Sequence, residues 1–222
     1  MFDLALTRVF GAVCPGCGSR GSWLCTNCAQ SAAPPEPCPP PRSVDRLFVG
    51  RSYTGVTREA TARLKYHNER VVIYWLIDPV VLKLKDALAA RDCGTSLGLL
   101  DPVTITWAPT TKMHRRSRGF DQAELLAAAI ARELKLGLSR RLIRLDNSPQ
   151  TGKGRGLRRV GPKVLALTPV EGLVIVVDDV VTTGSTLTAA ASALRDAGAS
   201  EIWGAVAART EWGKTRGAAC QM

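Results

Sequence analysis

The stretch that decides the fold is Val174-Ile175-Val176-Val177-Asp178-Asp179-Val180-Val181-Thr182-Thr183-Gly184-Ser185-Thr186-Leu187. With Leu173 before it, its first part is an uninterrupted apolar run, which is typical of a parallel strand buried on both faces. Two carboxylates follow, and a short hydroxyl-rich loop then opens a helix. Ligands bind at the carboxyl ends of the strands in open α/β sheets, so the stretch predicts a ligand site at this strand end.

The loop Thr182-Thr183-Gly184-Ser185-Thr186 is suited to a phosphate group. Gly184 allows a sharp turn and a close approach of the backbone. N–H groups at the helix start, the hydroxyls and the helix dipole can surround a dianion. Asp178 and Asp179 would repel the same phosphate, so we expect them to accept hydrogen bonds from the vicinal hydroxyls of a sugar. The stretch thus predicts a ribose 5-phosphate site; the alternative is an acidic strand end followed by an ordinary helix cap.

Strands and helices alternate along the rest of the chain. This alternation predicts an α/β fold in which a parallel sheet with right-handed crossovers is flanked by helices. Hydrophobic patterning and turn residues place the elements. The expected strands are 46–53, 103–108, 141–145, 173–177 and 202–207, and the expected helices are 55–65, 69–90, 121–136 and 186–197.

Composition divides the chain into three parts. Residues 1–31 form a small cysteine-rich module, residues 32–43 a proline-rich linker, and residues 44–222 the α/β domain. Six prolines among the ten residues 32–41 favour an extended polyproline-type spacer and exclude a helix.

Four of the seven cysteines lie in the first part. Cys14 and Cys17, and Cys25 and Cys28, form two C-x-x-C pairs separated by seven residues. Four thiolates on two tight turns are typical of a tetrahedral structural Zn²⁺ site, and the sequence shows no open coordination position. The alternatives are a redox dithiol or free thiols. Cys38, Cys93 and Cys220 receive no role.

The net charge is +11, which favours an anionic partner, either a phosphorylated small molecule or nucleic acid. General solubility explains the charge equally well. No apolar run reaches the length of a membrane span, and the first six residues include no basic segment of a signal peptide. We therefore expect a cytoplasmic protein.

The strand 103–108 is followed by a second motif, Arg115-Arg116-Ser117-Arg118-Gly119-Phe120-Asp121-Gln122. Together with residues 174–187, this motif resembles the ComF family of phosphoribosyltransferase-like proteins, whose members often carry an N-terminal zinc module. The match covers nearly the whole chain in the same order, and Lys65-Tyr66 matches a lysine that the family often shows near its first helix. The family more often has Asn at the position of Asp121, although Asp caps a helix equally well.

The resemblance implies a type I phosphoribosyltransferase fold that binds 5-phosphoribosyl 1-pyrophosphate with Mg²⁺. Arg115 and Arg118 would hold the pyrophosphate as fixed-charge donors, although a solvated basic turn also fits them. Residues 148–159 would form a mobile lid or a nucleic-acid contact. His114 receives no role.

Three functions remain open, the third being a regulatory protein built on the same fold. The first is a phosphoribosyltransferase of the glycosyltransferase class, whose acceptor is not named because the residues show no dedicated general base and no base-binding hood. The second is a non-catalytic nucleic-acid-binding or adaptor protein in DNA uptake (natural competence). Its partners would be single-stranded nucleic acid or a protein of the competence machinery.

Overall fold

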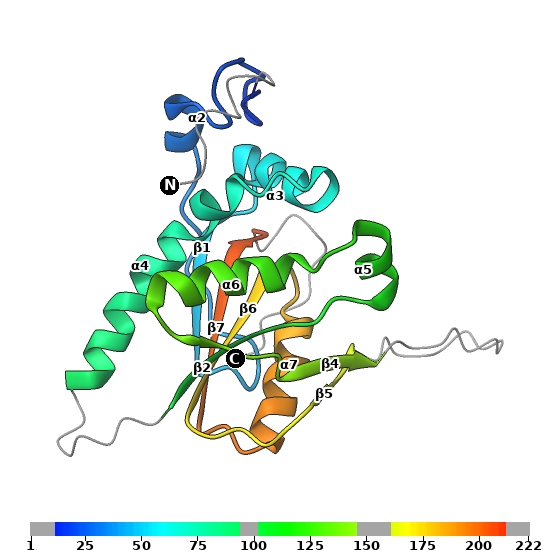
Figure 1. Cartoon of the computed structure of the whole chain (residues 1–222). Helices are drawn as coiled ribbons and strands as arrows, with labels where there is room; N and C mark the ends of the chain where they lie inside the picture. Colours follow the sequence, from blue (N-terminus) through cyan, green and yellow to red (C-terminus); the bar gives the residue numbers. More distant parts are fainter. Residues whose placement is uncertain (1–11, 94–101, 146–160, 212–222) are drawn as a thin grey trace.

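The computed structural model describes residues 12–93, 102–145 and 161–211 (Figure 1). Within them, a five-stranded sheet has the order β1-β7-β6-β2-β3, and every neighbouring pair is parallel. The predicted parallel sheet is thereby confirmed. Its strands are β1 (Arg46–Ser52), β2 (Val103–Trp107), β3 (Gly137–Leu138), β6 (Leu173–Val181) and β7 (Glu201–Arg209).

Helices cover both faces of this sheet (Figure 1). Ile175 and Val177 pack in the cluster formed with α3, α4 and α6, whereas Val174 and Val176 pack in the cluster formed with α7. Successive residues of a strand point to opposite faces, so a strand covered on both sides must be apolar at every position. The helices are α3 (Gly55–His67), α4 (Val72–Cys93), α6 (Gln122–Leu134) and α7 (Ser185–Asp196).

Two local features differ from the sequence prediction. The residues after the strand 103–108, where no helix was expected, form α5 (Lys112–Arg118), which is capped by Thr111 and ends at Gly119 with φ 78°. The expected strand 141–145 is β4 (Leu142–Leu145), but it pairs antiparallel with β5 (Lys163–Ala166) in a separate two-stranded sheet. The predicted lid at residues 148–159 lies outside the described residues.

The cysteine-rich segment lies against α3. It contains the short helix α2 (Thr26–Gln30), and the Arg63 guanidinium of α3 donates to the carbonyl of Val13 at 2.7 Å. Trp23 packs against the core on the side of α3, α4 and α6. In the described ranges, no helix combines the length and apolar character that crossing a membrane requires.

Candidate functional site

The two acidic residues lie near the carboxyl end of β6, which continues past the predicted end to Val181. Each carboxylate accepts from the next backbone N–H: Asp179 N lies 2.8 Å from Asp178 Oδ1, and Val180 N lies 2.6 Å from Asp179 Oδ1. These bonds fix the orientation of both side chains. Asp178 lines a small pocket together with residues 180–187, so the structure brings the predicted phosphate loop and one predicted acid into one site.

A lysine from a distant element completes this acidic cluster. Lys65, in the last turn of α3, places Nζ 2.8 Å from Asp179 Oδ2, and each side chain is only 17% exposed. Lys65 was not among the expected site residues. The match of Lys65 to a lysine of the family was the signal that could have identified it as a site residue.

Asp178 titrates unusually because of these surroundings. Desolvation raises its pKa well above the ordinary value of an aspartate, and the negative charge of Asp179 raises it further. The N–H of Asp179 and the charge of Lys65 act in the opposite direction without cancelling the rise. A charged Asp178 is therefore costly in this fold, and strongly shifted acids in a pocket are frequent at functional sites.

The phosphate loop, residues 182–186, follows β6 and includes the first two residues of α7. Gly184 occupies the N-cap position of α7 with φ 74°, a left-handed conformation that favours glycine. Thr183 and Ser185 on either side of it are exposed, and their hydroxyls lie 3.1 Å apart. The pocket is also lined by Val180, Val181 and Leu187, which the prediction did not include because apolar side chains carry no binding signal.

The predicted pyrophosphate residues lie on α5 and contact other elements. Arg115 is 3.8 Å from Glu124 of α6 and about half exposed, so this pair contributes little. Arg118 donates to Gln122 at 2.9 Å, and its guanidinium lies 5.4 Å from the ring centre of Tyr66. Tyr66 follows Lys65 in α3, so the end of α3 contacts both the acidic pair and α5.

Asp121 has a structural role beside this site. Its buried carboxylate accepts from Ala123 N at 3.1 Å, which caps α6, and from Thr110 N at 3.0 Å, just after β2. Burial raises the pKa of Asp121, while the N–H groups that it accepts from act to lower it. The predicted helix cap is confirmed, and Asp121 also fixes the chain that leaves β2.

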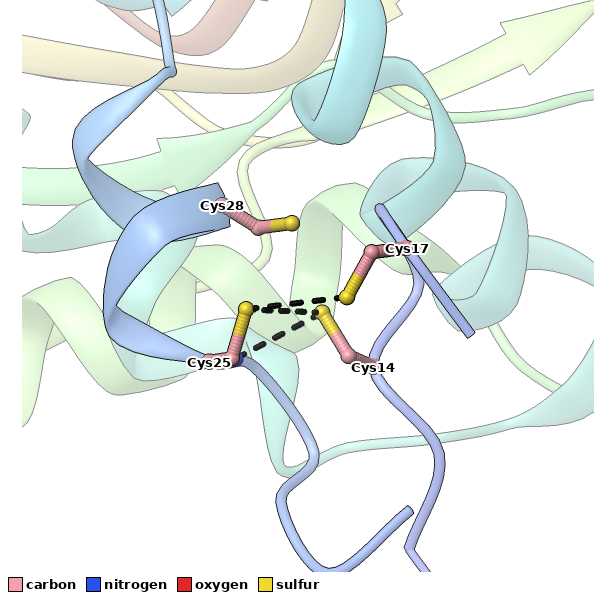
Figure 2. A group of neighbouring side chains, drawn as sticks. All are labelled: Cys14, Cys17, Cys25 and Cys28. Atoms are coloured by element: carbon pink, nitrogen blue, oxygen red, sulfur yellow. Dashed lines mark hydrogen bonds between the residues drawn. The ribbon is translucent and has the colours of Figure 1, made fainter. Parts of the chain in front are cut away.

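The four cysteines of the predicted metal site come together. Figure 2 shows their sulfur atoms turned toward a common centre, and all four lie within 4.8 Å of one another. Cys25 Sγ lies 3.8 Å from Cys14 Sγ and 3.7 Å from Cys17 Sγ. Tetrahedral Zn²⁺ with bonds of about 2.3 Å requires sulfur separations of about 3.8 Å, so the donor set fits zinc.

Backbone groups and crowding shape the chemistry of these thiols. Burial acts to raise the pKa of Cys14, but backbone N–H groups, first that of Cys25, lower it to about 6. The thiol of Cys28 lies among the other three. Its hydrogen bond with the Cys25 side chain, and to a smaller extent its burial, raise its pKa to about 12. Four clustered sulfurs cannot all ionise without a cation, which is the condition that a bound divalent metal satisfies.

Comparison with known proteins identifies relatives of this chain. The family model "Phosphoribosyl transferase domain" matches residues 121–216. "Competence protein F" of Haemophilus influenzae is 31% identical over 86% of this chain and 83% of its own length, and "DNA utilization protein YhgH" of Salmonella typhimurium is 30% identical over 86% and 82%. A purine phosphoribosyltransferase from Pyrococcus horikoshii covers 64% of this chain and 80% of its own, with 21% identity and a TM-score of 0.36.

Proposed function

We propose, since the chain belongs to the ComF family of phosphoribosyltransferase-like proteins, that it binds 5-phosphoribosyl 1-pyrophosphate together with Mg²⁺. The observation that carries the proposal is the pocket at the end of β6, where Asp178 and the phosphate loop line one site. A ribose 5-phosphate needs anion donors at one end and hydroxyl acceptors at the other. Both lie within a few residues of each other here.

Each part of the site has a role in this proposal. The phosphate loop binds the 5-phosphate through backbone N–H groups at the start of α7 and through its hydroxyls. Asp178 and Asp179 accept from the 2- and 3-hydroxyls of the ribose. The Oδ1 atoms accept from the backbone, and Asp179 Oδ2 also lies 2.8 Å from Lys65 Nζ, so a ribose hydroxyl at Asp179 would share that oxygen with the lysine. Lys65 pairs with Asp179 and offsets part of the negative charge of the acidic pair.

The pyrophosphate is assigned to Arg115 and Arg118 of α5. Arg115 contacts Glu124 and Arg118 contacts Gln122, both on α6, and pyrophosphate oxygens would replace these contacts. Mg²⁺, bound with the diphosphate, would supply charge neutralisation for the leaving group. Transfer to an acceptor would then be promoted by positioned charge rather than by a protein nucleophile.

In the same proposal residues 1–31 are a metal module, residues 32–43 a linker, and residues 44–222 the ligand-binding domain. The module would hold one structural Zn²⁺ through Cys14, Cys17, Cys25 and Cys28. Its contact with α3 through Arg63 makes the metal a support for the helix that carries Lys65.

Calorimetric titration with 5-phosphoribosyl 1-pyrophosphate and Mg²⁺ tests the proposal. We expect wild-type protein to bind one ligand per chain. The double variant Asp178→Asn, Asp179→Asn should lose binding while remaining folded, and Asp86→Asn, an exposed position on α4, should bind as wild type. The proposal is contradicted if folded, zinc-loaded wild-type protein releases no heat with 5-phosphoribosyl 1-pyrophosphate and if ribose 5-phosphate shows no competing effect.

A nucleic-acid-binding role is the second candidate. The net charge of +11 favours it, and the names of the relatives refer to competence and to DNA utilization. Fluorescence anisotropy of labelled single-stranded DNA at increasing salt separates the two functions. Binding through Z phosphate contacts weakens with a log–log slope of about −0.7Z. A steep slope together with no effect of Asp178→Asn would favour nucleic acid over the phosphoribosyl ligand.

A further inference from the structure

The proline-rich segment does not lie free between two modules. The carbonyl of Ala33 accepts from Ser52 N at 3.0 Å, at the end of β1. The carbonyl of Glu36 lies 3.4 Å from the guanidinium of Arg209, at the end of β7. The segment is therefore fastened along the carboxyl edge of the main sheet, next to the pocket.

The segment also reaches the phosphate loop itself. A Cβ placed on Gly184 would lie 2.9 Å from Cγ and 3.1 Å from Cβ of Pro41, which is closer than side chains pack. Gly184 is buried although Thr183 and Ser185 are both exposed. The proline ring therefore lies against the turn of the loop.

The chain that follows Pro41 is held by hydrogen bonds. The carbonyl of Pro41 accepts from Val44 N at 3.1 Å. Asp45, which follows Val44, accepts through Oδ2 from Ile202 N at 2.6 Å and from the Arg195 guanidinium at 2.6 Å. A proline ring fixes φ and loses little freedom on folding. The ring is thus a rigid element, and the chain that follows it is anchored through Asp45 to the start of β7 and the end of α7.

We infer that Pro41 is a positioning residue of the phosphate site, which holds Gly184 in its left-handed turn and so keeps the N–H groups of the loop directed at the ligand phosphate. The inference rests on the proposed function for its ligand, but its structural part does not need one. Binding sites gain affinity when their loops are held in the bound shape before the ligand arrives. Without this contact, an exposed loop that contains a glycine would lose that shape readily.

The first test replaces the proline ring. Pro41→Gly should accelerate amide hydrogen exchange at residues 183–187 and leave the centre of β6 unchanged. It should weaken binding of 5-phosphoribosyl 1-pyrophosphate by about five- to tenfold, the effect of a modest loss of preorganisation. Pro169→Gly, an exposed proline between β5 and β6, makes the same chemical change away from the loop and should alter neither measurement.

The second test probes the contact between Pro41 and Gly184 directly. Gly184→Ala introduces a methyl group against the Pro41 ring, whereas Gly184→Ala in a Pro41→Gly background has room for it. The loss of stability on adding the methyl group, measured by urea unfolding, should therefore be smaller in the double variant. The strain of a positive φ is common to both backgrounds and cancels in the comparison.

The outcomes separate this inference from the proposed function. Unchanged exchange in the loop, or additive effects in the double variant, overturns the inference whatever the ligand result. Faster exchange with unchanged affinity overturns the claim that the contact serves binding. If wild-type protein binds no phosphoribosyl ligand, the proposed function fails, and the exchange and coupling measurements alone decide whether Pro41 positions the loop.

Discussion

Asp178→Asn should make the protein more stable at neutral pH while it removes ligand binding. The carboxylate is desolvated and lies beside Asp179, and both effects oppose its charge. Asparagine keeps the Oδ1 atom that accepts from Asp179 N at 2.8 Å but carries no charge. Removing an unfavourable charge without losing its hydrogen bond should raise the free energy of unfolding by about 0.5–2 kcal/mol.

The gain should depend on pH in a defined direction. The pKa of Asp178 is higher in the folded than in the unfolded chain, so the folded chain binds more protons between the two values. The wild type therefore loses stability as pH rises from the unfolded value, about 3.9, through the folded one. Asp178→Asn lacks this loss, so its advantage should be small at low pH and complete once pH exceeds the folded pKa.

Urea unfolding at about pH 4.5 and about pH 8 measures both quantities. Asp86→Asn is the control, because the same substitution at an exposed position should give no pH-dependent difference. If Asp178→Asn is less stable than wild type at both pH values, or its gain is independent of pH, the acid is not under electrostatic strain. The charge of Asp178 would then carry no cost that a ligand could relieve.

Three further perturbations test other parts of the site. Lys65→Met removes the cation 2.8 Å from Asp179 and should destabilise the protein by about 1–3 kcal/mol, whereas Lys65→Arg should restore most of the lost stability; equal losses in both variants would show that the charge is unimportant. Removing zinc with a chelator, or Cys14→Ser, should lower the melting temperature and the metal content measured by atomic absorption; an unchanged metal content of one per chain after Cys14→Ser would contradict the four-cysteine site. Asp121→Ala leaves two backbone N–H groups without their acceptor and should cost about 2 kcal/mol in urea unfolding; a cost below about 0.5 kcal/mol would refute the buried cap.

Much of the fold follows from local sequence. The apolar run at residues 173–177 predicts a doubly covered strand, and the spacing of the four cysteines predicts their convergence. The Asp121 cap also follows from its position before α6. In each case one short segment contains the chemistry that fixes its structure.

The features that were not predicted depend on distant segments or on weak patterns. The pairing of Lys65 with Asp179 joins two elements more than a hundred residues apart in sequence, and the position of Pro41 depends on the packing of β1 and α7. Helix α5 has basic residues around most of its surface and no buried residue, so no hydrophobic period marks it. Thr111 before it and Gly119 after it are the capping signals that could have revealed it.

The proposed function requires the phosphate loop to bind the 5-phosphate of a ribosyl ligand. The most direct measurement is a two-dimensional amide NMR titration of the zinc-loaded protein with ribose 5-phosphate, followed by 5-phosphoribosyl 1-pyrophosphate with Mg²⁺. The amide signals of residues 183–186 should shift saturably with both ligands, and those of α5 should respond only to the diphosphate. Saturable shifts confined to other surfaces, or no shift in the loop at millimolar ligand, would contradict binding of the 5-phosphate by the loop.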